Sequence, residues 1–111
     1  MVNYTVILFS LEDEGISVTI KAYFEGQNLV VEGYDIGKIV EESWGDSDYE
    51  YVTNVPAEEV PKLYPLFDVK PGNKLELLYA IKDRFHDNFC YSNFSEFLRT
   101  NDIKSDGYSW T

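Results

Sequence analysis

The sequence predicts an α+β domain: an antiparallel sheet of about four to five strands, covered on one face by two to three helices from the C-terminal half. Two observations lead to this prediction. Apolar side chains recur at every second position in segments before Pro56 and at helical spacing after Pro71. Short polar turns join the expected strands, which favours a meander of antiparallel neighbours over parallel crossovers.

The expected strands are Tyr4–Phe9, Ile16–Phe24, Leu29–Tyr34 and Asp48–Val55, with a final edge strand within Ile103–Trp110. The clearest of them is the second, where apolar residues alternate with Ser, Thr, Lys and Tyr, so that one face is apolar and the other mostly polar. In the fourth, the tyrosines share one face and Glu50 lies on the other.

A short helix of one or two turns is expected after Asp35, a possible N-cap, because Ile36, Ile39 and Val40 have helical spacing and Gly45 ends the pattern. Three prolines then predict a broken helix over Pro56–Phe67, since proline removes a helical hydrogen bond and clashes with the preceding turn. Its inward residues are expected to be Val60, Leu63 and Phe67.

The strongest helix prediction begins at Asn73, which resembles a capping box together with Glu76. The apolar stripe of this helix consists of Leu77, Leu78, Ile81 and Phe85. A third helix is expected to be capped by Ser92 or Asn93 and to carry Phe94, Phe97 and Leu98.

The 111 residues suit one domain, spanning 1–111, and 44% hydrophobic residues suffice for a core. The longest apolar run, Val6–Phe9, is far shorter than the roughly 20 residues that cross a bilayer. No basic residue or long apolar stretch marks a secretory signal near Met1. The single cysteine, Cys90, excludes an internal disulfide and favours a reducing compartment, so a cytoplasmic location is expected.

The formal net charge of −11 is unevenly distributed: residues 1–55 hold 11 acidic and 2 basic side chains, and residues 56–111 hold 9 and 7. Such a field repels phosphate backbones and anionic membranes, so neither nucleic acid nor membrane is an expected ligand. A basic protein would be attracted.

We therefore expect a small protein-binding module of bacterial or phage type that docks on a basic partner, as an inhibitor or immunity protein of a basic nuclease or as a nucleic-acid mimic. Large aromatic side chains beside carboxylates suit an interface anchor with a charged rim. The residues expected to bind are Glu41, Glu42, Trp44, Asp46, Asp48, Tyr49, Glu50 and Tyr51. An alternative is that these charges only maintain solubility and that the aromatics cover the core of a structural domain.

A divalent-cation site is a second alternative, because Asp46, Asp48 and Glu50 alternate and would project to one side of an extended segment. The pattern is not an EF-hand, which would need glycine at Tyr51 and glutamate at Ala57. A solvated acidic turn explains the same residues, and no metal ligand or cofactor is assigned.

No catalytic residue is predicted. His86 and Cys90 are the only residues of their kinds and lie four apart, but the flanking Phe89 and Tyr91 indicate a buried thiol. Phosphate-binding and nucleophile-elbow motifs are absent. An enzyme with an unrecognised carboxylate site is the least favoured alternative. Pairing of two copies through the edge strand near Tyr108 would give a homodimer, which the sequence leaves open.

Overall fold

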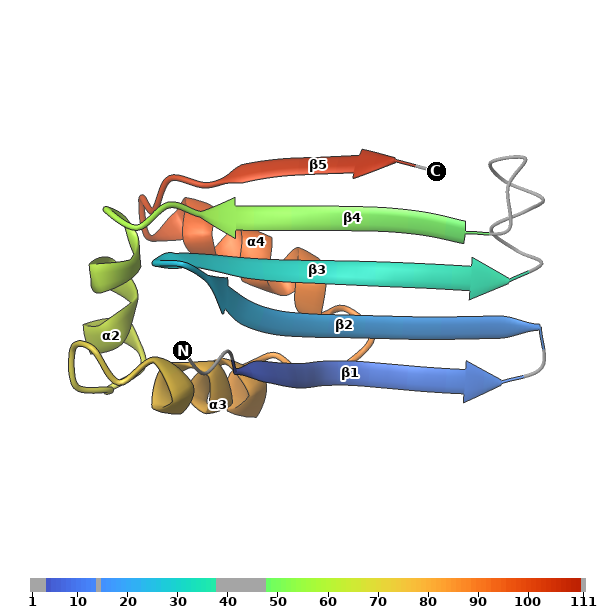
Figure 1. Ribbon diagram of the computed structural model, residues 1–111, viewed down its shortest axis with the longest axis horizontal. Coiled ribbons are helices and arrows are strands. Elements are labelled where there is room, and N and C mark those ends of the chain that lie inside the picture. The colour runs from blue at the N-terminus through green and yellow to red at the C-terminus, as the bar shows by residue number, and fades with distance from the viewer. Residues whose placement is uncertain (1–3, 14, 38–47, 111) are drawn as a thin grey trace.

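The computed structural model describes residues 4–13, 15–37 and 48–110, apart from the side chains of Asp48 and Trp110. Five strands form one antiparallel sheet in which each strand lies beside its neighbours in the sequence (Figure 1). They are β1 (Thr5–Asp13), β2 (Ile16–Glu25), β3 (Asn28–Gly37), β4 (Asp48–Val55) and β5 (Asp106–Trp110). The α+β class, the antiparallel meander and the edge strand near the C-terminus are confirmed.

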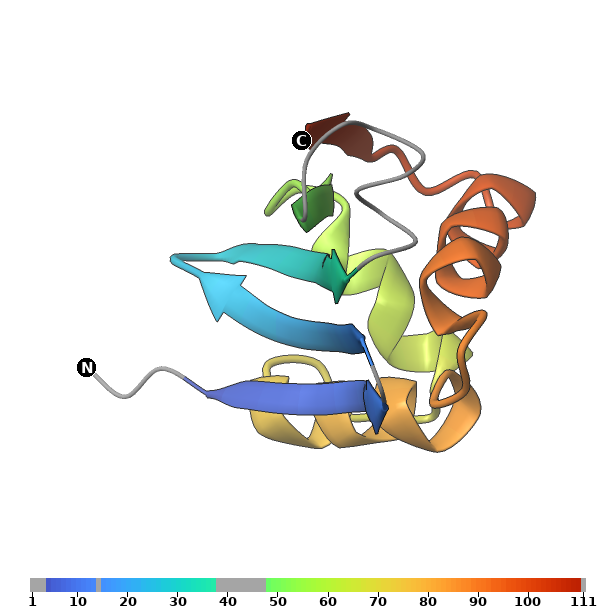
Figure 2. The ribbon, with the colours of Figure 1, turned by 90° about the vertical axis from the view of Figure 1, so that its right-hand side faces the viewer.

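The helices come from the C-terminal half and lie on one side of the sheet (Figure 2). After β4 the chain forms a 3₁₀ turn, η1 (Val60–Lys62), and then α2 (Leu63–Leu66), α3 (Lys74–Arg84) and α4 (Cys90–Thr100). The broken helix expected around the prolines is confirmed by η1 and α2. Within the described residues, no helix combines the length and apolar character that crossing a bilayer requires.

The hydrophobic core fills the space between the sheet and the helices. The alternating apolar residues of β2 supply one side of it, and the stripe predicted on α3 supplies the other. Fully buried members include Ile20, Leu29, Val31, Val55, Leu63, Leu77, Leu78, Ile81, Phe94 and Leu98. Burial of each large apolar side chain contributes about 1.5–3 kcal/mol before entropy is counted, so this layer holds the helices to one face.

The short helix expected after Asp35 is wrong over the described residues. Asp35–Gly37 belongs to β3 and pairs with Ile16–Val18 of β2. β2 begins directly after the turn at Gly15. The backbone groups of its first residues therefore need partners, and the end of β3 provides them. Ile39, Val40 and Gly45 lie outside the described residues.

The predicted helix caps also differ from what forms. Asn73 does precede α3, but its Nδ2 donates to Glu76 Oε2 at 3.0 Å, and its side chain accepts no hydrogen bond from the helix backbone. The N-terminus predicted at Ser92 or Asn93 is wrong, because α4 begins at Cys90.

The start of α4 is ordered instead by a turn just before it. The Oδ1 atom of Asp87 accepts a hydrogen bond from the backbone N–H of Phe89 at 2.9 Å, and its carbonyl accepts one from the N–H of Cys90 at 3.0 Å. An aspartate that binds the backbone two residues on is typical of turns. The turn at Asp87 therefore marks the boundary between α3 and α4.

Glu59 fixes the point where the chain enters β5. The residue is 8% exposed, and its Oε1 accepts hydrogen bonds from Lys62 Nζ and from the backbone N–H of Lys104, each at 2.8 Å. These hydrogen bonds, that from Lys62 first, hold the pKa of the Glu59 carboxyl below its usual value. Residues far apart in the sequence are thereby joined next to the last strand.

Candidate functional site

One face of the sheet is covered by no described helix, and we call it the open face (Figure 2). The strand register places its residues in rows that cross the sheet. The first row contains Thr5, Tyr23, Val30, Asn54 and Asp106; the second contains Ile7, Lys21, Glu32, Val52 and Tyr108; the third contains Ser10, Thr19, Tyr34, Glu50 and Trp110. The open face thus combines tyrosines and carboxylates from strands that are distant in the sequence.

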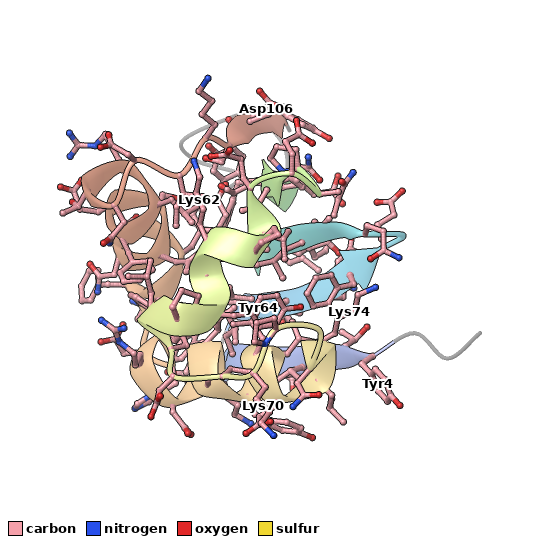
Figure 3. The ribbon with its side chains drawn as sticks, turned by 90° about the vertical axis from the view of Figure 1, so that its left-hand side faces the viewer. Tyr4, Lys62, Tyr64, Lys70, Lys74 and Asp106 are labelled. Carbon is pink, nitrogen blue, oxygen red and sulfur yellow. The ribbon has the colours of Figure 1, made fainter. Side chains whose placement is uncertain are left out.

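Charge is divided between the sheet and the helical layer. The five strands contain eight acidic residues and a single basic one, Lys21. By register, six of the eight take open-face positions: Glu12, Glu25, Glu32, Asp48, Glu50 and Asp106. The other seven described basic residues lie in helices and connections, and three of them, Lys62, Lys70 and Lys74, lie around the α2 end of the molecule (Figure 3). The open face is therefore the more acidic side.

Two valines of the open face are nearly buried. Val30 and Val52 take open-face positions and yet are only 4% and 7% exposed. Register places Tyr23 beside Val30 and Tyr108 beside Val52, so each valine has a large ring as its cross-strand neighbour. Partial burial first, and then the negative charge of Glu32, raise the pKa of Tyr23 above its usual value. Two nearly buried valines therefore lie among tyrosines and carboxylates on the open face.

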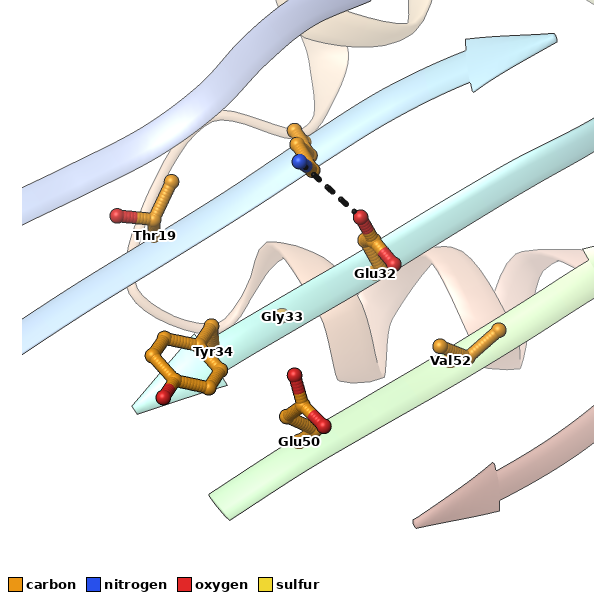
Figure 4. Close-up of a pocket in the computed structure, with 7 residues that line it drawn as sticks. Thr19, Glu32, Gly33, Tyr34, Glu50 and Val52 are labelled. Carbon is orange, nitrogen blue, oxygen red and sulfur yellow. Dashed lines mark ion pairs between the residues drawn. The ribbon is translucent and has the colours of Figure 1, made fainter. Parts of the chain in front are cut away.

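A hollow of about 340 Å³ lies on this face, lined by Thr19, Glu32, Tyr34, Glu50 and Val52 among others (Figure 4). At its border, Lys21 Nζ lies 3.2 Å from Glu32 Oε1 and 5.9 Å from the centre of the Tyr23 ring. The open face thus already binds one ammonium group between a carboxylate and a tyrosine. Glu50 makes no ion pair with any residue that the structure describes.

The structure separates the predicted binding residues that it describes. Glu50 lies on the open face, and the backbone register gives Asp48 the same side. Tyr49 and Tyr51 lie on the opposite, helix-covered face, as the predicted alternation requires. The remaining members, Glu41, Glu42, Trp44 and Asp46, lie outside the described residues.

Tyr51 belongs to a tyrosine cluster between β4 and α4. Its hydroxyl donates to Asp35 Oδ1 at 2.8 Å, and its ring centre lies 4.6 Å from that of Tyr91 and 5.6 Å from that of Tyr49. The Tyr91 hydroxyl in turn accepts a hydrogen bond from Thr53 Oγ1 at 2.7 Å. These contacts connect the sheet to α4, and the three tyrosines line a groove beside β5.

The two residues considered for nucleophilic chemistry lie in different environments. Cys90 is fully buried, and burial raises the pKa of its thiol to about 11. The exposed His86 has its Nδ1 atom 2.9 Å from the carbonyl oxygen of Lys82, with which it shares a hydrogen bond. A thiol that stays protonated at neutral pH is a poor nucleophile, which fits the expected role of Cys90 as a small core residue.

No three His, Cys, Asp or Glu side chains gather into a possible metal site within the part of the chain that the structure describes. Asp46 and the Asp48 side chain lie outside that part, so the divalent-cation site with Glu50 stays a prediction.

The residues that sequence reasoning missed are Tyr23, Glu32, Tyr34 and Tyr108 as members of one face. The alternation of apolar and polar residues in β2 places Tyr23 on the polar face, so this part of the grouping could be predicted from the sequence. The pairing that brings it beside Val30 and close to Glu32 depends on the register set by the turn at Gly26, which has a φ of 63°. Sequence spacing alone does not supply that register.

The chain was compared with known proteins at three levels. No protein-family model, no curated protein and no solved structure matches it.

Proposed function

We propose that the open face is the docking surface of a small protein-binding module whose partner is a basic protein. The observation that carries the proposal is the gathering of carboxylates and tyrosines around the apolar pair Val30 and Val52 on a sheet face without a helical cover. Inhibition of a basic nuclease is one concrete form of this function, and we propose the cytoplasm as its location.

The proposed surface contains the residue types that protein interfaces use. Tyr23 and Tyr108 contribute large rings with a polar end, a residue type enriched at interfaces. The carboxylates of the open face, with the net charge of −11, favour encounter with a positive surface and raise its association rate at low salt. The pair of Lys21 with Glu32 and Tyr23 indicates how a partner's ammonium or guanidinium group would bind.

The experiment compares two charge reversals of equal size. Glu50→Lys changes the open face, and Asp83→Lys changes an exposed position on α3, in the helical layer. Each variant and the unmodified protein are immobilised and exposed to host lysate, and a basic protein that binds is then purified. Isothermal titration with that purified protein at several salt concentrations gives the dissociation constants.

Support requires a basic partner whose affinity falls at least about tenfold on Glu50→Lys and changes little on Asp83→Lys, because one reversed contact at an interface costs more than a distant charge. Equal losses in the two variants would contradict the proposal, since net charge alone would then explain binding. Recovery of no basic partner at low salt would also end it.

A further inference from the structure

The last strand has an edge that no described residue pairs with. β5 pairs with β4 from Asn54 and Asp106 to Glu50 and Trp110, and Figure 1 places it outermost in the sheet. Successive backbone N–H and C=O groups of a strand point to opposite edges, so β5 presents donors and acceptors on its outer side. Asp106, Gly107, Tyr108 and Ser109 are all exposed.

The opposite edge of the sheet is protected in two ways that the described residues do not provide for β5. The register of β1 shifts between Ile7 and Phe9, which interrupts the regular spacing of its backbone groups. α3 also packs against β1. The pairing of β5 with β4 contains no such shift, so β5 is the edge that can receive another strand.

The two sides of β5 differ in what they offer an incoming strand. On the open face it presents Asp106 and Tyr108, and Tyr108 is 59% exposed. On the other side, the small residues Gly107 and Ser109 border a groove of about 470 Å³ that Tyr49, Tyr51 and Tyr91 also line. Alternate side chains of a sixth strand would therefore meet a carboxylate with an exposed ring on one side and tyrosine rings on the other.

We infer that β5 is a docking edge for an extended segment of the basic partner, with lysine or arginine on the open-face side and apolar or aromatic residues over the tyrosine groove. This inference rests on the proposed function and specifies how the partner binds. Charge decides between a partner and a second copy: two chains of −11 repel each other, whereas a basic segment is attracted to Asp106 and the nearby Glu50. Lys104, two residues before the strand, is the nearest basic residue in the sequence.

The test uses the acetylated and amidated peptide Lys-Val-Lys-Tyr-Lys-Val-Lys and the full protein. Two further peptides are methylated on backbone nitrogens. In one of them the lysines carry the N-methyl groups, and in the other the remaining residues carry them. Because neighbouring N–H groups of a strand point to opposite edges, only one of these peptides keeps the donors that face β5. Titration calorimetry gives the affinities, and NMR-detected amide exchange locates the peptide.

Strand addition predicts that one methylated peptide binds at least about tenfold more weakly than the parent and that the other binds like the parent, since two or three backbone hydrogen bonds are lost in only one of them. The outward amides of β5 exchange slowly only in the complex. Weakening of both methylated peptides alike, or of neither, overturns the inference. So does a free protein that sediments as a dimer with those amides already protected.

The two proposals fail separately. If the partner's affinity depends on Glu50 but neither methylated peptide is selectively weakened, the open face binds the partner and the β5 edge does not. If the methylation pattern appears and Glu50→Lys leaves partner binding unchanged, the edge is a strand-binding site and the open face loses its proposed role.

Discussion

The ring of Tyr51 in β4 lies directly over Gly33 in β3, its partner in the register. A Cβ atom at residue 33 would overlap ring atoms of Tyr51. The ring has little freedom to move away, because Tyr91 packs against it and its hydroxyl binds Asp35. Gly33 has no positive φ, so the glycine is required for space and not for backbone conformation.

Gly33→Ala is therefore expected to destabilise the protein by about 1–3 kcal/mol, the usual cost of forcing extra atoms into a packed site. The melting temperature and the denaturant midpoint measure the effect. Gly107→Ala is the matched control in β5, where an added Cβ would lie 3.6 Å from the carbonyl oxygen of Val52, an ordinary contact. Equal stability of the Gly33 and Gly107 variants would contradict this account of the Tyr51 ring.

A second prediction concerns Asp35, whose carboxyl group lies beside Tyr51, and the change of stability with pH. Burial raises the pKa of Asp35, and the hydrogen bond from Tyr51 opposes that rise. A carboxyl whose native pKa lies above its unfolded value of about 3.9 favours the native state below that pH, and this contribution is lost as the pH rises through the native pKa. At pH 7 the ionised Asp35 therefore lowers stability.

Asp35→Asn keeps an oxygen that accepts the Tyr51 hydrogen bond and removes the charge. We expect a higher melting temperature than that of the unmodified protein at pH 7 and a smaller difference at pH 3, where the carboxyl is protonated. Asp83→Asn, at an exposed position on α3, serves as the control and should change stability little at either pH. If Asp35→Asn instead lost stability, and lost more at pH 7 than at pH 3, the ionised Asp35 carboxylate would stabilise the fold, which contradicts the expectation.

The strands could be predicted because their signal is local: a residue's face follows from its parity along the chain, as in β2 and β4. Asp35–Gly37 was missed for the opposite reason. Its short apolar spacing resembles a helix, and only pairing with Ile16–Val18, a non-local interaction, decides for a strand.

The same distinction applies to the candidate site. Clustering in the sequence suggested that Tyr49, Glu50 and Tyr51 act together, yet adjacent strand residues point to opposite faces. Glu50 instead shares the open-face hollow with Tyr34 and Glu32. Such a grouping depends on the register of neighbouring strands, which the sequence pattern does not determine by itself.

A third prediction concerns Arg84 at the end of α3. Its guanidinium carbon lies 4.9 Å, 5.0 Å and 5.7 Å from the ring centres of Phe97, Phe67 and Phe85, and its Nη1 donates to the carbonyl oxygen of Leu66 at 3.4 Å. Arg84 thereby joins α3 to α4 and to the end of α2. Arg84→Met keeps much of the apolar stem but removes the charge, so we expect a loss of about 1–2 kcal/mol by denaturant unfolding.

Arg99→Met provides the comparison, because Arg99 is exposed and, among the described residues, its side chain forms an ion pair with Glu96, one turn away on α4. Its loss should lower the denaturant midpoint much less than Arg84→Met does, as expected for an exposed surface pair. If the Arg84 and Arg99 variants lost the same stability, contact of Arg84 with the three rings would contribute nothing beyond surface charge.

The last prediction concerns the thiol of Cys90, at the first residue of α4. Full burial, with a smaller contribution from the charge of Asp87, raises the pKa of this thiol to about 11. The thiolate is the reactive form, so an aromatic disulfide reagent at pH 8 should modify the native protein at least about a hundredfold more slowly than the denatured chain.

The same burial sets the expected stability of two variants: Cys90→Ala should fold with a loss of about 1 kcal/mol, whereas Cys90→Ser should lose more because it buries a hydroxyl group. Rapid modification of the folded protein would show that the thiol is accessible and would revive a nucleophilic role for Cys90 with His86 nearby in the sequence.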